Sequence, residues 1–377
     1  MTQHNLSTSN SKSPPIAPRA RWRDCVVVGI GFLATVIMFD VVVGYCFRLQ
    51  GDESASSTGP LNRYFEYGRS VESKIRRMVG PDGRQHPLFS AGWVEQQGAT
   101  APESGASMTV YGQSFSNHVA LASKEFLRDF ETRLIGGPAA TLSHSYFAFL
   151  QDKHWSKSEV VVLGILASSL PNIQSMTHMT AFWQGPAPHT YPRYVLNADS
   201  RLQAITPLVR SETDLCAALA DGAKWTEFAS QLALHDAFFD PFVFNRFLDW
   251  SPTFRLLRRG WGQSHARAVT AKLHTRDGFA PEAVAVARAI LRTFVARARK
   301  GGRPVVVMLF NDRGYANHLD EALVPALHES EVQFVSSHEV APAGNLANFV
   351  PDGHFRPDIE RELGRRLAST IREVLGH

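Results

Sequence analysis

The hydrophobic pattern of this chain starts with one long apolar run at residues 25–47, which reads CVVVGIGFLATVIMFDVVVGYCF. As an α-helix rising 1.5 Å per residue, the run would extend about 34 Å, enough to cross the hydrocarbon core of a bilayer. One acid, Asp40, interrupts the run beyond its midpoint, where insertion costs less than at the centre. Two interpretations of Asp40 stay open: a polar residue tolerated near the membrane interface, or a contact with another helix.

The charges on either side of this run predict its orientation, because basic flanks remain on the cytosolic side of a membrane. Lys12, Arg19, Arg21 and Arg23 precede the run, whereas Arg48, Asp52 and Glu53 follow it. We therefore expect a single-pass protein of the inner (cytoplasmic) membrane, with a cytosolic N-terminus and a periplasmic or otherwise extracytoplasmic body. The run is long for a cleaved signal peptide, and no small-residue cleavage site follows it, so we predict a signal anchor.

Composition divides the rest of the chain around this anchor. Residues 1–24 are rich in Ser, Pro, Asn and Thr, which is typical of a disordered tail. Residues 48–60 have the polar, Gly- and Ser-containing composition of a linker. The remaining residues, 61–377, form the expected extracytoplasmic body. Apolar side chains at helical spacing over 61–79 predict an amphipathic helix that packs against this body.

Within the body, strand-like and helix-like patterns alternate. Continuous apolar runs, such as EVVVLGIL at 159–166, are typical of strands buried on both faces. This alternation predicts an α/β fold, a three-layer α/β/α sandwich with a mostly parallel sheet. The expected strands are 108–111, 137–142, 159–166, 304–310 and 332–336, and the expected helices are 117–133, 282–299 and 358–375.

An aromatic-rich, mostly helical segment at about 186–275 breaks the alternation. Because strands lie on both sides of it, we expect an insertion into the same body rather than a separate domain. Its aromatic side chains have two interpretations. The first is simple packing. The second is a platform for sugar rings or a basic and aromatic face near the membrane, with Arg255, Arg258 and Arg259 beside Trp261.

Charge and cysteine content exclude several classes of function. The net charge is +4 and the basic residues are dispersed, so no nucleic-acid-binding surface is predicted. The three cysteines, Cys25, Cys46 and Cys216, form neither a disulfide framework nor a CxxC motif. The histidines do not follow the spacing of a metal-binding motif. We predict no metal site and no cofactor.

Polar residues that follow the expected strands are the candidates for chemistry. Ser114 comes two residues after Gly112 at the end of the first strand, where its hydroxyl could project over the sheet and its N–H could face an oxyanion. The alternative is that Ser114 or Ser116 caps the next helix. Asp352 and His354 precede the last helix, and in an extended loop this spacing places both side chains on one side. They could then serve as orienting acid and general base for a serine nucleophile.

This order, Gly-x-Ser-Phe-Ser near the start and Asp-x-His before the last helix, resembles the SGNH (GDSL-type) hydrolases. Within them the chain is most similar to the membrane-anchored or periplasmic proteins of alginate-type polysaccharide O-acetylation. The resemblance implies that Ser114 is the nucleophile, His354 the base and Asp352 the orienting acid. It also implies oxyanion donors near the ends of the second and third strands. The candidates for these donors are Gly137 or its neighbour Gly136, Ser168 and Asn172.

The chain departs from the family pattern at two places. Gln113 stands where the family usually has Asp, and Gly164 and Asn172 are too far apart for the usual Gly-x-Asn-Asp motif. His118 is close to Ser114 in sequence, but helical geometry would place it about one turn along, so we expect His354 to be the base. His144 and His338 are expected to be structural or exposed.

Together these features predict an extracytoplasmic acyltransferase, with acetyl as the expected group, that modifies an exopolysaccharide. The resemblance also implies an integral membrane partner that supplies the acyl group. Two alternatives remain. The departures at Gln113 and in the third motif favour a catalytically silent scaffold in polysaccharide assembly. A carbohydrate or cell-wall esterase would use the same three residues.

Overall fold

The computed structural model describes residues 18–46, 60–79, 88–97, 101 and 106–376 of the 377-residue chain. The predicted tail lies outside these residues up to residue 17. The predicted linker also lies outside them, except for Pro60.

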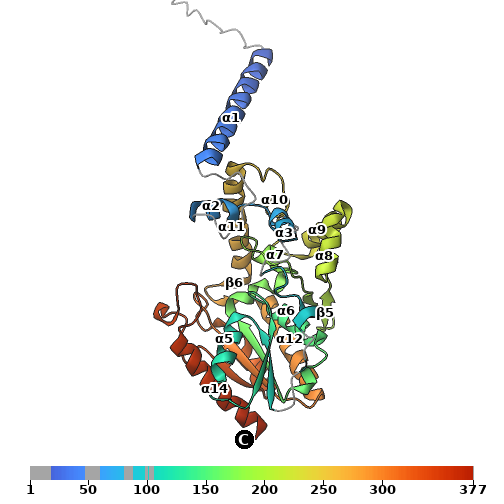
Figure 1. Cartoon of the computed structure of the whole chain (residues 1–377), viewed down its shortest axis with the longest axis vertical. Helices are drawn as coiled ribbons and strands as arrows, with labels where there is room; N and C mark the ends of the chain where they lie inside the picture. Colours follow the sequence, from blue (N-terminus) through green and yellow to red (C-terminus); the bar gives the residue numbers. More distant parts are fainter. Residues whose placement is uncertain (1–17, 47–59, 80–87, 98–100, 102–105, 377) are drawn as a thin grey trace, which may run out of the picture.

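Five parallel strands form the central sheet, in the order β2-β1-β3-β8-β9 (Figure 1). Strands β1, β3 and β8 are buried along their whole length, as the continuous apolar runs of β3 and β8 predict. Since the strands are parallel, their carboxyl ends meet at one edge of the sheet. The strands are β1 (Ser107–Gly112), β2 (Glu131–Gly136), β3 (Val160–Leu166), β8 (Val305–Phe310) and β9 (Gln333–Ser336).

Helices cover both faces of this sheet and confirm the predicted α/β fold. On one face α5 (Ser114–Ser123) and α14 (Pro357–Leu375) pack over a core that includes Met308 and Leu367. On the other face the core includes Phe149 and Phe294. The helices of that face are α6 (Leu142–Gln151), α12 (Pro281–Lys300) and α13 (His318–Glu329).

Two predicted elements between β1 and β3 were wrong. The helix expected at 117–133 spans Ser114–Ser123, and the strand expected at 137–142 is instead β2, Glu131–Gly136. β2 is an edge strand with a single buried residue, Ile135, so it lacks the continuous apolar run of the inner strands. Residues 137–141 form the loop into α6, in which the Thr141 side chain accepts the His144 N–H.

The chain leaves the sheet after β3 and returns to it with α12. The predicted insertion at 186–275 falls within this segment. The segment between β3 and α12 holds five α-helices and two short antiparallel hairpins, β4-β5 and β6-β7. Its elements are α7 (His178–Ala181), β4 (Arg193–Leu196), β5 (Leu202–Ile205), α8 (Glu212–Ala220), α9 (Gly222–His235), α10 (Pro241–Phe244), α11 (Pro252–Leu273), β6 (His274–Thr275) and β7 (Gly278–Phe279), with 3-10 turns η3 (Ala167–Ser169) and η4 (Pro171–Gln174).

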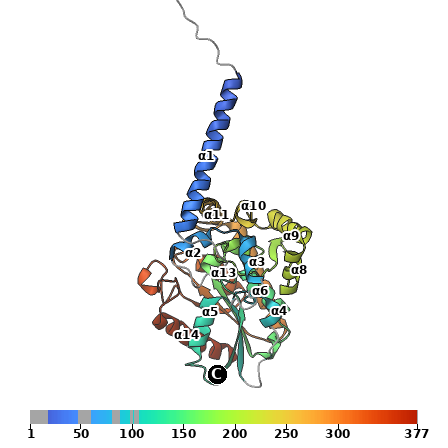
Figure 2. The same cartoon turned by 45° about the horizontal axis from the view of Figure 1, so that its top comes forward.

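The helix predicted at 61–79 is two helices, α2 (Pro60–Tyr67) and α3 (Val71–Val79). The break falls at Gly68, where an added Cβ would lie 2.0 Å from the backbone oxygen of Arg255 in α11. A larger residue there would separate α2 from α11. Figures 1 and 2 show α2, α3, α10 and α11 between the sheet and the N-terminal helix. The short α4 (Val94–Gln97), η2 (Trp155–Lys157) and η5 (Leu346–Asn348) are the other helical segments of the described chain.

Arginines of α11 tie these helices together, and two of the three arginines of the proposed basic face are buried. Arg255 pairs with Glu66 of α2, and Arg258 pairs with Asp249, which also accepts the Ser70 hydroxyl. Both arginine side chains are buried. Burying a charge is tolerated when it is paired and hydrogen-bonded, so these arginines hold the helices together rather than face a membrane.

The N-terminal helix α1 (Pro18–Cys46) projects from the body (Figure 1). Its segment Trp22–Cys46 is long and apolar enough to cross a membrane, features that anchors share with signal sequences. Asp40 of this segment is buried. Its carboxylate accepts the Ser251 hydroxyl and, at 2.9 Å, the Thr253 backbone N–H, at the start of α11. Of the two interpretations of Asp40, the contact with another helix is the one observed.

Candidate active site

Ser114 stands at the turn from β1 into α5. Gln113 is the N-cap residue, with an extended backbone and no side-chain capping bond, so neither Ser114 nor Ser116 caps this helix. The Ser114 hydroxyl instead lies 2.7 Å from His354 Nε2. The two residues are 240 positions apart in the chain. This distance is that of a serine hydroxyl hydrogen-bonded to a general base.

Asp352 contacts the other side of the same imidazole. Its Oδ1 lies 3.2 Å from His354 Nδ1 and also accepts the His354 backbone N–H at 3.1 Å. The ring nitrogen is within ion-pair distance but is not aligned for a hydrogen bond. The loop is a turn rather than extended, since Gly353 has φ +96°, a conformation that favours glycine. The His354 backbone N–H, then its ring, lower the pKa of Asp352, so the carboxylate stays ionised.

The His354 ring packs against two other rings. Those of Phe115 and His118 each lie 4.8 Å from it, centroid to centroid. His118 Nδ1 in turn lies 2.7 Å from Glu360 Oε1 on α14. His354, the predicted base, therefore packs against His118, a contact that sequence reasoning missed together with Glu360. The spacing of four residues from Ser114 to His118 places both on one side of α5, which could have indicated it.

Ser116 stabilises the turn between β1 and α5. Its side chain is buried, and its hydroxyl donates to Gln113 Oε1 at 3.0 Å. A Cβ added at Gly112 or Gly164 would lie 2.2 or 1.9 Å from Ser116 Oγ, so both glycines make room for this side chain. Gly164 thus serves packing. Gln113, where the family pattern has Asp, is buried and accepts this bond.

The three oxyanion candidates lie at the carboxyl edge of the sheet but make other contacts. A Cβ at Gly137 would lie 2.8 Å from Gly92 Cα. Ser168 donates its backbone N–H to Asp312 Oδ1 at 2.9 Å. Asn172 is buried in η4, which packs against α11 and α12. Within the described part of the chain, none of the three is hydrogen-bonded to Ser114.

The first turn of α5 offers a different set of donors. The first backbone bond of this helix joins the Asn117 N–H to the Gln113 carbonyl. The N–H groups of residues 114–116 therefore have no intrahelical partner, as at every helix start. They lie beside the Ser114 hydroxyl, and the helix dipole favours negative charge at this end. An oxyanion formed at Ser114 can be bound here.

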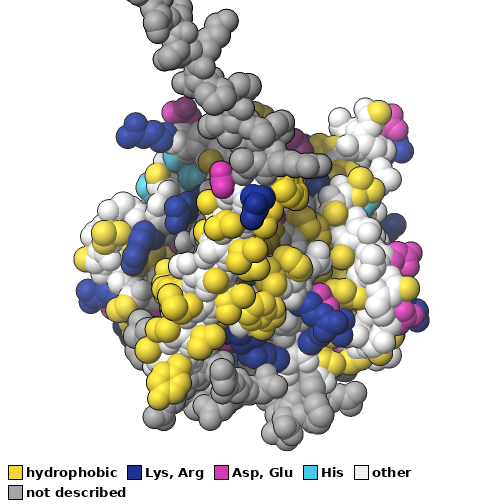
Figure 3. Space-filling model, turned by 90° about the horizontal axis from the view of Figure 1, so that it is seen from above, with side chains coloured by type: hydrophobic (Ala, Val, Ile, Leu, Met, Phe, Trp, Pro, Cys, Tyr) yellow, Lys and Arg dark blue, Asp and Glu magenta, His cyan; other side chains and the backbone are white. Residues whose placement is uncertain are grey.

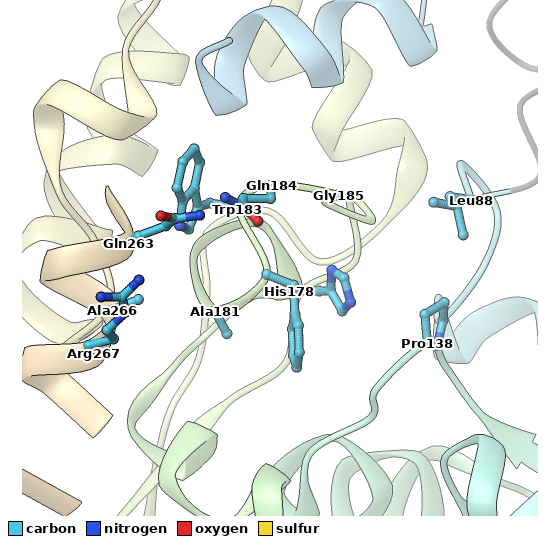
Figure 4. Close-up of a pocket in the computed structure, with 11 residues that line it drawn as sticks. Leu88, Pro138, His178, Ala181, Trp183, Gln184, Gly185, Gln263, Ala266 and Arg267 are labelled. Carbon is cyan, nitrogen blue, oxygen red and sulfur yellow. The ribbon is translucent and has the colours of Figure 1, made fainter. Parts of the chain in front are cut away.

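A pocket of about 540 Å³ opens at the same edge of the sheet (Figure 4). Its lining residue Pro138 follows β2, the strand next to β1, whereas Ser114, Asp352 and His354 do not line the pocket. Gln263 and Arg267 line the pocket from α11, and His178, Trp183 and Gln184 line it from α7 and the loop after it. Amide, guanidinium and aromatic groups together suit a hydroxyl-rich ligand.

Three buried histidines, His144, His178 and His189, form a cluster beside this pocket. The His189 ring lies 4.9 Å from that of His144 and 5.2 Å from that of His178. Burial lowers the pKa of His144 to about 4 and that of His178 to about 3, and it holds the pKa of His189 well below its usual value. The cluster is therefore neutral near pH 7. No group of three His, Cys, Asp or Glu residues in the described ranges is arranged to hold a metal ion. His144 is structural, as expected.

Comparison with known proteins adds little to this geometry. No family model and no curated protein matches the sequence. Among solved structures, the chain is similar to a proposed acylhydrolase from Bacteroides fragilis, with 9% identity, TM-score 0.35, and coverage of 75% of this chain and 94% of that one. It is also similar to an acetyl xylan esterase from the rumen bacterium Butyrivibrio proteoclasticus, with 9% identity, TM-score 0.34, and coverage of 74% and 66%. Neither likeness bears on the chemistry of this chain.

Proposed function

We propose that this protein is a membrane-anchored SGNH-type acyltransferase, with acetyl as the transferred group and an extracytoplasmic polysaccharide as the acceptor. The observation that carries the proposal is the 2.7 Å contact between Ser114 Oγ and His354 Nε2, with the Asp352 carboxylate beside Nδ1. A hydroxyl, an imidazole and a carboxylate in this order form the arrangement that activates a serine nucleophile.

The first half-reaction makes an acyl-enzyme. His354 Nε2 takes the proton of the Ser114 hydroxyl as Oγ attacks the acyl carbonyl carbon. The resulting oxyanion faces the N–H groups at the start of α5, and the Asp352 carboxylate stabilises the imidazolium. The intermediate then collapses, the bond to the donor oxygen breaks, and His354 returns the proton to that leaving group.

The second half-reaction transfers the acyl group. His354 takes the proton of an acceptor hydroxyl, whose oxygen attacks the ester carbonyl, and Ser114 Oγ leaves and regains a proton from His354. The pocket beside Pro138 would hold a sugar acceptor, since Gln263, Arg267 and His178 offer hydrogen-bonding groups and Trp183 an aromatic wall. An integral membrane partner would deliver the acyl group to Ser114 from the cytosolic side.

Hydrolysis is the second candidate, and one observation favours it. The Asp352 side chain is 70% exposed, so bulk water reaches this part of the site. Water in place of the sugar in the second half-reaction makes the protein an esterase. The scaffold alternative has less support, because Gln113 makes its hydrogen bond to Ser116 and leaves the contact between Ser114 and His354 intact.

The test uses the full chain in detergent with an activated acetyl ester and a fluorophosphonate probe. We expect covalent labelling at Ser114, its loss in Ser114→Ala, and a reduction by orders of magnitude in His354→Ala. The matched control is Ser230→Ala, which removes an exposed hydroxyl of α9. With oligosaccharides present, acetylated sugar forming faster than free acetate supports transfer, and free acetate alone supports the esterase. A chain that never labels at Ser114, and whose Ser114→Ala variant still supports polymer modification in cells, is a scaffold.

A further inference from the structure

The contacts of Asp40 show at which residue of α1 the body begins. The carboxylate binds Ser251 and the Thr253 N–H at the start of α11, and Val43, one turn further along α1, is also buried against the body. By contrast, the side chains of residues 25–35 of α1 are exposed. The body therefore begins at Asp40, within the apolar run rather than after it.

The length of the free part of α1 is too short to cross a bilayer by itself. Between the charged residues Asp24 and Asp40 lie residues 25–39, which rise about 22 Å as a helix. A bilayer has a hydrocarbon core of about 30 Å. The core must then extend past Asp40, alongside the last turns of α1, where the start of α11 also lies. Asp40 needs buried hydrogen-bond partners at this depth, and the structure supplies two.

The body exposes large apolar and aromatic side chains around this point. Phe247 and Trp250, which precede Ser251, are 65% and 67% exposed, and Leu257 of α11 is 57% exposed. On α2, which packs beside α11, Tyr64 is exposed and lies under the Arg259 guanidinium. Seen from the side of α1, hydrophobic side chains, those of α1 included, gather across the middle of the face, with arginine and lysine side chains around them (Figure 3).

We propose that Tyr64, Phe247, Trp250 and Leu257 form a lipid-binding surface embedded in the leaflet from which α1 emerges. The occupant is lipid because this surface is continuous with the apolar helix and lies at a depth that the helix length places inside the bilayer. Trp and Tyr are the side chains enriched at membrane interfaces. The six residues of α1 after Asp40 rise about 9 Å, which matches the 5–10 Å depth of interfacial helices.

This docking rests on the proposal that α1 spans the membrane. It adds to the proposed function an orientation of the body relative to the bilayer. Since α2, α3, α10 and α11 lie between the sheet and α1 (Figure 1), the surface holds the insertion against the bilayer. The pocket lined by Gln263 and Arg267 of α11 then lies on the side of the body nearer the membrane. A donor arriving through the membrane would enter from that side.

The test places a fluorescent probe on single cysteines of the full chain, after replacement of Cys25, Cys46 and Cys216 by serine. The chain is reconstituted in vesicles of phosphatidylethanolamine and phosphatidylglycerol, some of which carry a nitroxide near the top of the acyl chain. We expect the lipid nitroxide to quench probes in Phe247→Cys and Trp250→Cys. A probe in Asp129→Cys, at the amino ends of the strands, should be quenched by aqueous iodide alone. Quenching of all three probes by iodide alone overturns the proposal.

A second pair of variants tests whether Asp40 sets the docking. Asp40→Leu keeps the helix apolar but removes both acceptors, so the probes at 247 and 250 should lose their lipid quenching while the chain resists carbonate extraction. Asp40→Asn retains one acceptor oxygen, so the probes should keep most of their lipid quenching. Lipid quenching in native membranes but not in pure lipid vesicles would overturn the lipid surface in favour of a protein partner.

The same preparations separate this inference from the proposed enzyme. Fluorophosphonate labelling of Ser114 reports the catalytic site and does not depend on where the probes lie. Lipid quenching without labelling refutes the enzyme and supports the docking. Labelling with probes exposed to iodide refutes the docking alone. Release of the chain by carbonate refutes the membrane span and the docking with it.

Discussion

The imidazole rings of His118 and His354 lie 4.8 Å apart, tilted 33° from one another, and it is His354 whose Nε2 contacts the Ser114 hydroxyl. Glu360 of α14 holds the His118 ring through its contact with Nδ1. The proposed general base is thus packed against a neighbour that itself contacts another helix, α14. Small displacements of reacting groups lower the reaction rate, so a base that is held in one orientation is more effective.

His118 and Glu360 should act as positioning residues. We expect Glu360→Gln and His118→Asn to slow labelling of Ser114 by between about tenfold and a hundredfold, less than His354→Ala. The pH dependence of the labelling rate is the informative measurement, because loss of the Glu360 carboxylate changes the charge beside His118, whose ring packs on His354, whereas a packing defect alone leaves the profile where it was. Glu362→Gln, on the exposed side of the same helix, is the control. Unchanged rates and pH profiles in both variants would remove this role.

Asp352→Asn should reduce Ser114 labelling without unfolding the protein. An amide cannot stabilise the imidazolium, but this carboxylate is exposed, so solvent already weakens its effect. We therefore expect a loss of about tenfold to a thousandfold, smaller than that in Ser114→Ala. The melting temperature of the full chain should stay close to that of the wild type. A loss as large as that of His354→Ala would show that Asp352 does more than orient the ring.

Gly164→Ala should destabilise the sheet below the active site, because the new Cβ would lie 1.9 Å from Ser116 Oγ. Overpacking of this kind costs about 1–3 kcal/mol. The double variant Gly164→Ala with Ser116→Gly removes the colliding side chain and should recover part of the loss. Gly185→Ala, where an added Cβ meets nothing within 4 Å, is the control. Thermal melting of the four proteins gives the comparison, and equal melting temperatures for Gly164→Ala and the control would contradict the contact.

Acid should destabilise the protein through His144, His178 and His189. Burial holds the pKa of each below the unfolded value of about 6.5, so as the pH falls the unfolded chain binds protons that the folded chain does not. Stability is complete above about pH 6.5 and falls below it. Burial raises the pKa of Asp236 to about 6 and also raises the pKa of Asp312, and both acids oppose this change. Three histidines outweigh two acids, so the melting temperature should drop between about pH 7 and pH 5.

His144→Gln measures one part of this acid sensitivity. Removing one buried neutral histidine takes away up to one proton of uptake on unfolding, or about 1.4 kcal/mol per pH unit. The fall in melting temperature from about pH 7 to about pH 5 should therefore be smaller in His144→Gln, whatever its stability at neutral pH. The exposed His328 provides the matched control variant, His328→Gln. An equally steep fall in both variants would show that the cluster does not govern the response to acid.

The orientation of the chain can be tested with reporter fusions. The basic residues before the apolar run predict a cytosolic N-terminus and an external body. Alkaline phosphatase fused after Gly80, which lies outside the described residues, should therefore be active. A green fluorescent reporter at the same position should stay dark. The reverse pattern would place the body in the cytosol, where the lipid-facing surface would meet the other leaflet.

The sequence by itself determined the elements that depend on local pattern. The apolar runs of β3 and β8 predicted inner strands, since a strand covered on both faces is mostly apolar on both. The length of the N-terminal run predicted a helix able to cross a membrane. Ser114 and His354 stood out because residues that follow parallel strands or precede the last helix gather at one edge of the sheet.

Tertiary structure decided what depends on distant partners. β2 escaped prediction because an edge strand buries little and carries no apolar run of its own. The need for glycine at position 164 came from Ser116, on the neighbouring element, and the break at Gly68 came from the backbone of Arg255. Asp40 had two interpretations until Ser251, more than two hundred residues away, supplied its partner. Local pattern records whether a residue is buried, but the packing of separate elements determines which group it meets there.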